Sequence, residues 1–593
     1  MPASSSDGGA RWLSAGIVVA TMLAAAIAVS PNSADPDLWG HVQYGNDLLN
    51  DGLPRTTTYS YTAEGHRWIN HENLAELAMA LLARLGGWSL MTGKCLLGLT
   101  ALWLIIRSSR RQGAGLMVSC GLTLLIAVNL SYHWSIRPQL ASFFGFAVML
   151  GLLEHAFDGW SGQWQLSAER DTLKYSLTRL KRLWWAVPLF CVWANSHGGF
   201  VAGLCIFIAY LGLRAIEAMY QRGAAATGLV ARLALMALAV VLATLINPYG
   251  VKLHLWLLES LGQPRPEINE WHPPNFFNSL ALPLWLLMGV LACSLTLTRQ
   301  RHDFTHLVIL LITLWQALEH QRHIPFLALA IGFWLPRHIQ SWLSRWGLSE
   351  DEREAAPMPT WIAGAMAGGL LLALGLLGMR LYDRLQVVRV ERDEFPVGAV
   401  QYMADRQLGG NLVVTFNWAQ YLIGAFGAPD AEPRVRVAFD GRFRTCYPQE
   451  LVDAHFDFVL GNVKDRHVAS DHQFDEARAL YYRQPLGQAA DLVLINRFQP
   501  HGQLVMLRQG SAWTLLYQDG TAQLWGRSDR YNDPGKATYV APEQRSIRID
   551  PVGRRTKEQG HVAWPAYAGT ASSREAAKSR QGQMQGRADE ANL

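Results

Sequence analysis

The chain has 593 residues, of which 50% are hydrophobic and only 17% are charged, and its formal net charge at pH 7 is +5. A chain of this length and apolar content is neither one ordinary soluble domain nor a typical soluble protein. The basic residues form no stripe interleaved with aromatic side chains, which argues against nucleic acid as a partner. The six cysteines include no C-x-x-C pair, so the sequence predicts neither a zinc ribbon nor a disulfide framework.

Apolar runs occupy the chain up to residue 380, and their lengths approach the ~20 residues that cross the hydrocarbon core of a bilayer. They predict a polytopic α-helical membrane domain over residues 1–380. The first run lacks a small-residue cleavage site, so we expect it to be kept as an anchor. The predicted spans, about eleven in number, are 13–30, 88–107, 114–130, 138–157, 183–196, 198–218, 227–246, 279–298, 303–319, 323–343 and 361–379.

Basic residues in the short loops predict the orientation, because such residues favour the cytoplasmic side. Residues 71–87 contain Glu72, Glu76 and Arg84, and they predict an amphipathic helix in the membrane interface rather than a span. The N-terminus is then cytoplasmic and the chain after residue 380 is extracytoplasmic. The basic loops that share the predicted cytoplasmic face are 107–113, 174–185, 298–304 and 344–354.

Polar side chains gather in the loops predicted on the outer face, the largest of which is 31–87. Polar groups at a membrane boundary are costly unless they face a cavity or each other, so this gathering predicts a functional site. An aromatic belt at the interface explains tryptophan and histidine there, but not the carboxylates. The candidate site residues in these loops are Asp35, Asp37, His41, Arg137, His197, Lys252, Arg265, Arg322 and His323.

Asp35 and Asp37 flank Pro36 in the stretch "SADPDLWGHVQYG", where the first predicted span ends. Asp35 can be the N-cap of a helix whose first residue is Pro36. The two carboxylates can also hold a divalent cation, Mg²⁺ or Mn²⁺, or one can act as a general base that the other orients. Both alternatives stay open, because a capped carboxylate is also a rigid one. The histidine pairs 66/71 and 320/323 match no metalloprotease pattern, which favours hydrogen bonding to phosphate or sugar over a structural zinc site.

Motifs spread over about residues 10 to 527 resemble those of a known group. They are "DPDLW.H", "W.NHE.LAEL", "WANSHGGF", "INPYG", "PRPEI.EW.PP" and "QRHIPF", followed by "FPVGAVQYM", "NWAQYLIGAF" and "VAFDGR". The pattern is similar to a widespread, largely uncharacterised group of bacterial membrane proteins near the GT-C class of integral membrane glycosyltransferases. The chain departs from this group at Gly40, where a second aromatic residue is common, and at Ala419 and Gln420, where a glycine pair is usual.

The GT-C resemblance implies transfer of a sugar from a polyprenyl-linked donor to a glycan, lipid or protein acceptor on the outer side of the bacterial inner membrane. Asp35 and Asp37 match the position of the catalytic acid in the first loop. Such a transfer needs a base for the acceptor proton and a cation for the departing phosphate, for which arginine is the preferred side chain. The candidates for the donor's phosphate and sugar are His41, Arg137, His197, Lys252, Arg265, Arg322 and His323. Trp39, Trp68 and Trp271 can stack on sugars or anchor the interface.

Residues 381–527 predict a compact extracytoplasmic α/β domain, because helices alternate with short β-rich segments. Asp440 and Arg442 of "FDGR" stand at a strand end, where α/β folds gather ligand contacts, and are candidate acceptor-binding residues. An Asp-Gly turn is the simpler alternative. Residues 528–593 have almost no apolar periodicity and predict a disordered tail.

Two other functions stay open from the sequence. A transporter of a lipid-linked substrate predicts ionisable groups within the spans and repeated, broken helices, and the sequence offers few of the former and no repeat. A non-catalytic membrane scaffold with a partner-binding outer domain predicts that Asp35 and Asp37 are structural. The enzyme hypothesis predicts that the two acids face a cavity shared with Arg137, Arg322 and His323.

Overall fold

The computed structural model describes residues 5–160, 162, 176–347, 359–461, 490–549 and 560–567. The chain divides into two compact units. The helical unit comprises Met1–Asn32, Trp88–Leu261 and Ile268–Gln386, and the mixed unit comprises Ser33–Gly87, Gly262–Glu267 and Val387–Leu593.

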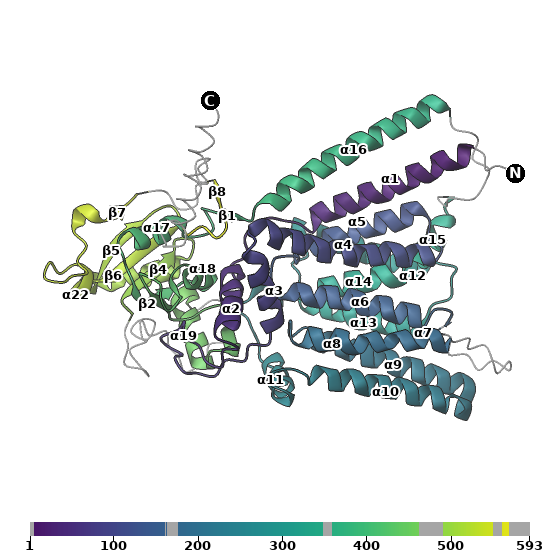
Figure 1. Ribbon diagram of the computed structural model, residues 1–593, viewed down its shortest axis with the longest axis horizontal. Helices are drawn as coiled ribbons and strands as arrows, with labels where there is room; N and C mark the ends of the chain where they lie inside the picture. Colours follow the sequence, from purple (N-terminus) through teal and green to yellow (C-terminus); the bar gives the residue numbers. More distant parts are fainter. Residues whose placement is uncertain are drawn as a thin grey trace. The chain divides into compact units, whose positions relative to one another are not determined.

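Every predicted span coincides with a helix or with two short helices of the helical unit, which run side by side (Figure 1). The predicted span 323–343 is broken in two, because Pro336 lacks the N–H that would continue the helix. The helices are α1 (Ser5–Ala28), α4 (Gly87–Arg111), α5 (Leu116–Ser131), α6 (Gln139–Ala156), α7 (Leu177–Lys181), α8 (Ala186–Ala194), α9 (Phe200–Arg222), α10 (Thr227–Thr244), α11 (Val251–Leu261), α12 (Leu282–Leu297), α13 (Phe304–Glu319), α14 (Ile324–Trp334), α15 (Pro336–Ser344) and α16 (Thr360–Gln386).

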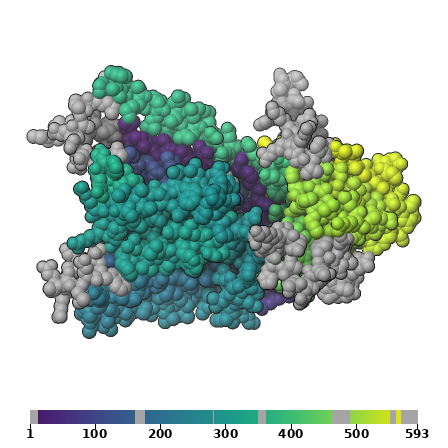
Figure 2. Space-filling view, turned by 180° about the vertical axis from the view of Figure 1, so that it is seen from behind, coloured from purple at the N-terminus to yellow at the C-terminus, as the bar shows by residue number. Residues whose placement is uncertain are grey.

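Four helical segments of the described chain are long and apolar enough to cross a membrane, namely Gly87–Arg111, Gln139–Ala156, Phe200–Thr244 and Trp361–Gln386. Large apolar side chains are also exposed on shorter helices, such as Trp315 on α13 at 62%. Figure 2 shows the later helices, in teal, covering a broad face of the helical unit. A surface of this kind favours contact with lipid. The count of about eleven spans and their orientation stay predictions.

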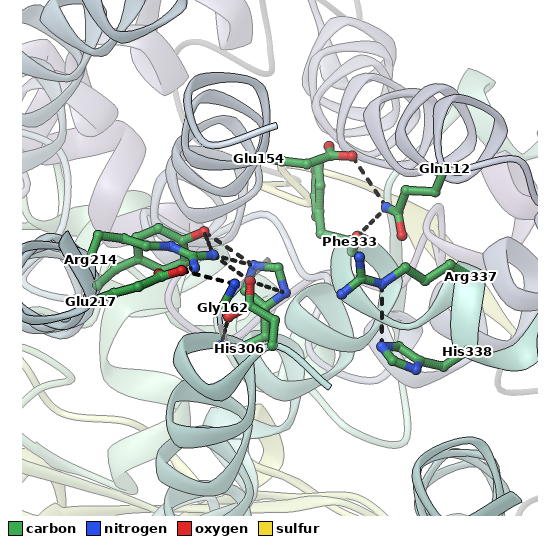
Figure 3. Close-up of polar contacts among 11 residues, drawn as sticks. Gln112, Glu154, Gly162, Arg214, Glu217, His306, Phe333, Arg337 and His338 are labelled. Carbon is green, nitrogen blue, oxygen red and sulfur yellow. Dashed lines mark hydrogen bonds and ion pairs between the residues drawn. The ribbon is translucent and has the colours of Figure 1, made fainter. Parts of the chain in front are cut away.

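The helical unit contains a buried ionic cluster made of Arg214, Glu217 and Asp303. Figure 3 shows Arg214 and Glu217 of this cluster side by side. Arg214 on α9 donates to Glu217 at 2.7 Å and to Asp303, just before α13, at 2.6 Å. Glu217 also accepts the backbone N–H of Gly162 at 3.0 Å. The three side chains are at most 2% exposed. Because the arginine always keeps its charge and both carboxylates are engaged, this Arg214 cluster ties α9 to the start of α13.

The mixed unit is built on a six-stranded sheet with the order β3-β2-β4-β6-β5-β7. Its first three strands are parallel, whereas β6 runs antiparallel to both β4 and β5. These strands and the helices confirm the predicted alternation of helix and strand. They are α17 (Val397–Asp405), β2 (Gly410–Val414), α18 (Phe416–Phe426), β3 (Val435–Val437), α19 (Gln449–Leu460), β4 (Leu492–Asn496), α21 (Pro500–Arg508), β5 (Trp513–Gln518), β6 (Ala522–Arg527) and β7 (Ser546–Ile547).

The segment after α1 belongs to the mixed unit, which differs from the predicted boundary at residue 380. It contains α2 (Leu38–Asn50) and α3 (Asn73–Ala83), and α2 packs against α18. Backbone pairing explains the grouping: Ser33 bridges to Arg389, and Tyr61 N–H donates to Val437 O at 3.2 Å. The first loop therefore belongs to a different compact unit from the helices that precede and follow it in the sequence.

The predicted disordered tail is wrong for residues 528–549 and 560–567. α22 (Ser528–Tyr531) follows β6, β7 pairs with β5, and β8 (His561–Ala563) pairs with β1 (Arg389–Glu391). Backbone pairing needs no apolar periodicity, so composition alone missed these strands. Residues 550–559 and 568–593 lie outside the described residues.

Candidate functional site

The predicted acids form the turn that begins α2. Asp35 Oδ1 accepts the backbone N–H of Asp37 at 3.0 Å, and Asp35 O accepts the N–H of Leu38 at 3.1 Å. Asp35 is 7% exposed, whereas Asp37 is half-buried at the N-cap position of α2. The helix begins at Leu38 rather than at Pro36, so Asp35 stabilises the preceding turn in the manner of an Asx-turn. Asp37 is the more accessible acid of the pair.

One turn into α2, His41 faces two glutamates. Its Nδ1 lies 3.1 Å from Glu76 Oε1 and 4.0 Å from Glu72 Oε2. The other oxygen of Glu76 accepts a hydrogen bond from Asn70 Nδ2 at 2.6 Å. His41 and Glu76 are 9% and 2% exposed, and the side chain of Glu72 is 22% exposed. We call His41, Glu72 and Glu76 the His41 cluster.

Helix geometry brings the His41 cluster together. Glu72 is the N-cap of α3 and Glu76 lies in its first turn, so a spacing of four residues puts both on one face. His41 and Gly45 are also four residues apart, on the facing side of α2. A Cβ added at Gly45 would clash with the backbone carbonyl of Glu76. Only glycine therefore permits this close approach of α2 and α3.

The electrostatics of the His41 cluster favour a protonated histidine. Burial alone lowers the pKa of His41, but the hydrogen bond with Glu76 and the charges of Glu72, Glu76 and Asp37 outweigh it and raise this pKa to about 9. Burial raises the pKa of Glu76, and His41 opposes that rise. His41 thus carries a proton at neutral pH when no other cation is bound.

The His41 cluster also has the composition of a metal site. Its three ligand atoms lie within 4.8 Å of one another, and no other such group occurs among the residues that the structure describes. One imidazole and two carboxylates suit Zn²⁺ or Mn²⁺ better than Mg²⁺. Asn70 would orient Glu76 from behind, as outer partners of metal ligands do. The predicted cation ligands, Asp35 and Asp37, are not members of this group.

The sequence analysis named His41 but missed Glu72 and Glu76 as its partners. The pattern that identifies them is H-E-x-x-x-E over residues 71–76, in which two acids are one helical turn apart. His41 is more than 30 residues away from both glutamates in the sequence, and no local pattern predicts that the three side chains meet.

The "FDGR" loop, residues 439–442, lies beside Asp37. A Cβ added at Gly441 would clash with both Asp37 Oδ1 and Gln420 Nε2. Asp37 is therefore seated against the backbone of this loop, within the mixed unit. The close approach requires glycine at position 441.

Asp440 and Arg442, the candidate acceptor-binding residues, form a buried ion pair. Arg442 donates from Nε to Asp440 Oδ1 at 2.9 Å and from Nη2 to Oδ2 at 2.7 Å, and Tyr447 donates to Oδ2 at 2.6 Å. Asp440 is 0% exposed and Arg442 is 7% exposed. Burial by itself raises the pKa of Asp440, but the charge and hydrogen bonds of Arg442, together with the hydrogen bond from Tyr447, outweigh burial and lower this pKa. These contacts stabilise the loop, and a role in acceptor binding stays a prediction.

Aromatic rings of the first loop surround this ion pair. The guanidinium of Arg442 lies 4.9 Å from the ring of Tyr44 and 4.6 Å from that of Trp68. Trp68 is 3% exposed, and Trp39, at 1%, donates from Nε1 to Pro565 O at 2.9 Å. Both tryptophans are thus core residues, and their rings are occupied by contacts within the mixed unit.

Gly40 of α2 lies against Gln420 of α18. The space for a Cβ at Gly40 is occupied by the amide of Gln420. Gln420 is 2% exposed, and its Oε1 has no hydrogen-bond partner among the described residues. A large side chain at one of these positions leaves no room for a large side chain at the other. The sizes of residues 40 and 420 therefore depend on each other across the contact between α2 and α18.

The helical unit brings together a second group of predicted residues. Arg137 pairs with Glu270 at 3.3 Å, and the guanidinium of Arg322 lies 4.5 Å from the ring of Trp271. His323 lies beside them, with its ring 6.3 Å from that of Trp271. The ring of His323 also lies 5.5 Å from that of His320.

The remaining predicted residues lie elsewhere. His197 Nδ1 hydrogen-bonds with Ser142 Oγ at 2.7 Å in the helical unit, and Lys252 is exposed on α11. Arg265 belongs to the mixed unit, in the segment Gly262–Glu267. Asp35, Asp37 and the His41 cluster lie in the mixed unit, whereas Arg137, Arg322 and His323 lie in the helical one. Their shared cavity stays a prediction.

No protein-family model and no curated protein matches the sequence. The chain is similar to the solved structure of the archaeal oligosaccharyltransferase AglB from Archaeoglobus fulgidus, in complex with an inhibitory peptide and a dolichol-phosphate. The identity is 10%, the TM-score is 0.49, and the match covers 82% of this chain and 69% of AglB. ArnT from Cupriavidus metallidurans matches at 14% identity and a TM-score of 0.46, over 88% of this chain and 98% of ArnT.

The arabinofuranosyltransferase AftD from Mycobacteria matches at 15% identity and a TM-score of 0.39, over 87% of this chain and 41% of AftD. All three scores lie below 0.5.

Proposed function

We propose that this protein is a membrane glycosyltransferase of the GT-C type, which transfers a sugar from a polyprenyl-phosphate-linked donor to an extracytoplasmic acceptor. The observation that carries the proposal is the environment of Asp37. This half-buried carboxylate begins α2, is held by the turn that Asp35 makes, and lies against Gly441 and within the electrostatic reach of His41. A rigid acid beside a cluster able to hold a cation is what a transfer from a phosphate-linked donor needs.

Asp37 is assigned the role of general base. Its carboxylate takes the proton of the acceptor nucleophile as that atom forms a bond to the anomeric carbon of the sugar. The bond from this carbon to the phosphate oxygen breaks, and the electron pair leaves with the polyprenyl phosphate. Asp35 is assigned a positioning role, because its hydrogen bond to the Asp37 backbone N–H fixes the turn.

The His41 cluster is the candidate holder of a divalent cation, through His41 Nδ1 and the carboxylates of Glu72 and Glu76. Such a cation would supply positive charge near a departing phosphate. Without it, the protonated His41 is the positive group of the cluster. Arg137 and Arg322 of the helical unit are the candidates for contact with the donor phosphate, because a guanidinium can bind two phosphate oxygens at once.

Transfer of radiolabelled sugar from a panel of polyprenyl-phosphate sugars, by purified protein in nanodiscs, tests this proposal. We expect Asp37→Asn to lower the rate by about 10²–10⁴-fold, the usual contribution of a general base. Asp35→Asn should have a smaller effect, since the amide oxygen can still accept the backbone hydrogen bond. Asp51→Asn, the same change at an exposed position at the other end of α2, is the matched control.

Transfer that is unchanged in folded Asp37→Asn protein would overturn the role of this acid. The pair would then be a helix start and nothing more. A parent protein that transfers no sugar from any donor, while it binds a partner through the mixed unit, would favour the non-catalytic scaffold.

A further inference from the structure

A polar cavity of about 420 Å³ lies in the helical unit, next to the end of α5. It is bounded by residues 128–133, by the loop 269–284 that leads into α12, and by the start of α14. None of the candidate site residues from the sequence analysis lines it. Its polar side chains are Asn129, Tyr132, His133, Asn269, His272, Asn275, Asn278 and Gln321.

The lining is polar but uncharged. No Asp, Glu, Lys or Arg occurs among the described residues that form the cavity wall. Amides, imidazoles and a tyrosine hydroxyl offer both donors and acceptors of hydrogen bonds without a net charge. An anion would find no counter-charge in this wall, and a purely apolar ligand would leave these groups unsatisfied.

His133 gives independent evidence of a ligand. Its side chain lies in the cavity wall and the residue is only 6% exposed, yet its ring nitrogens make no hydrogen bond with any residue that the structure describes. Burial lowers the pKa of His133 to about 4, because it outweighs the opposing charge of Glu270 and is reinforced by the charge of Arg322. The ring is therefore neutral at pH 7 and offers one donor and one acceptor. A hydroxyl-bearing ligand in the cavity could exchange hydrogen bonds with both ring nitrogens.

Asn129 is fixed in the same wall. Its Nδ2 donates to Leu125 O at 2.9 Å and to Pro283 O at 3.0 Å. Both amide hydrogens are thus used, whereas no described residue donates to Oδ1. These two hydrogen bonds hold the Asn129 amide rigidly, so that its Oδ1 is available as an acceptor at the cavity. A fixed acceptor of this kind is typical of a preformed binding site.

Two hydrogen bonds from Gln321 also hold the opposite rim in place. Gln321 donates its backbone N–H to His272 O at 3.0 Å and its Nε2 to Asn269 O at 2.9 Å. Pro273, Pro274 and Pro283 restrict the same loop. The cavity is therefore preorganised, and little entropy is lost on ordering its wall when a ligand binds.

We propose that this cavity binds an uncharged sugar unit, whose hydroxyls exchange hydrogen bonds with His133, Asn129 and the loop 269–278. The volume lies within the range of about 300–1,000 Å³ that is typical of small-molecule sites. The inference rests on the proposed function only in treating this sugar as part of a substrate. Sugar binding itself is measurable without transfer.

Saturation-transfer NMR on the full chain in nanodiscs tests the proposal with neutral methyl hexopyranosides as probes. Methyl glucuronide and glucose 6-phosphate are the anionic comparisons. His133→Phe keeps the ring and removes both nitrogens, and Ala281→Phe fills the cavity without removing a polar group. The control is His66→Phe, the same substitution at an exposed histidine of the mixed unit. Unchanged thermal melting shows that each variant is folded.

We expect saturation of at least one neutral glycoside, with a loss of at least fivefold in both cavity variants and none in His66→Phe. Neutral glycosides that bind equally well to both folded cavity variants, or that do not bind at all, would overturn the assignment. A stronger signal from the anionic sugars would also overturn it. Because the measurement needs no donor lipid, a failure of sugar transfer with intact sugar binding would count against the proposed function alone.

Discussion

The Arg214 cluster and the His41 cluster each combine one basic side chain with two carboxylates, but they differ in what the basic group can do. In the helical unit, Arg214 cannot lose its proton, and its partners Glu217 and Asp303 are almost fully buried. In the mixed unit, His41 can lose its proton, and the side chain of Glu72 is 22% exposed. The first arrangement is a permanent link, whereas the second can exchange a proton for a metal ion.

Charge count and burial alone do not distinguish a structural ionic cluster from a functional one. The nature of the basic group does so, together with access. An arginine among buried acids has one stable state, so selection for stability alone explains it. A histidine between two acids has two states, and its carboxylates are the ligands that a divalent cation prefers.

The largest expected effect is on stability in the helical unit. Arg214→Met leaves Glu217 and Asp303 buried without their cation, and we expect a loss of about 3–5 kcal/mol of unfolding free energy. His41→Met should cost less, about 1–3 kcal/mol, because it leaves one partly exposed and one buried acid. Unfolding in mixed detergent micelles, followed by circular dichroism, measures both. Equal losses in the two variants would remove the distinction between the clusters.

The pH dependence of metal binding sharpens the comparison. Because the folded-state pKa of His41 is raised to about 9 from an ordinary 6.5, its stabilising effect is fully present below pH 6.5 and is lost as the pH rises through 9. A metal ion must displace this proton. We therefore expect the affinity for Zn²⁺ or Mn²⁺ to increase with pH, by up to about tenfold per pH unit between 6.5 and 9.

Isothermal titration calorimetry in buffers of different ionisation enthalpy measures this exchange, with release of about one proton per metal ion bound near neutral pH. Glu76→Gln removes a ligand and should weaken binding at every pH. Mutation of the Arg214 cluster should leave the metal affinity unchanged. Metal binding that is independent of pH, or that persists in Glu76→Gln, would show that another site holds the ion.

The sequence predicted the helices of both units well, since apolar runs and the alternation of helix and strand are local patterns. It also predicted Asp35, Asp37 and His41 as members of one region. It failed where pairing is distant: β1 with β8, and the first loop with the strand that precedes "FDGR". The partners of His41 lie more than 30 residues away, and the wall of the polar cavity comes from three separate segments. Neither local periodicity nor composition carries such information.

The smallest expected effect concerns the sizes of residues 40 and 420 at the contact between α2 and α18. An aromatic residue at position 40 would collide with the Gln420 amide, so Gly40→Phe should lower the stability of the mixed unit by about 1–3 kcal/mol. Gln420→Gly alone leaves a small void and removes a buried Oε1 that lacks a partner, so its two effects oppose each other.

The double variant places a large residue at position 40 and a small one at position 420, which reverses the present order of sizes. We expect it to recover most of the loss, with a coupling free energy of about 0.5–3 kcal/mol between the two positions. Thermal unfolding of the parent, the two single variants and the double variant measures this coupling. The control is the same set of four proteins with Ala425→Gly, another substitution on α18, in place of Gln420→Gly. Additive effects would mean that the two positions vary independently and that the contact between α2 and α18 does not constrain them. A strong coupling would make this contact part of what holds Asp37 in place, since Gln420 also lies against Gly441.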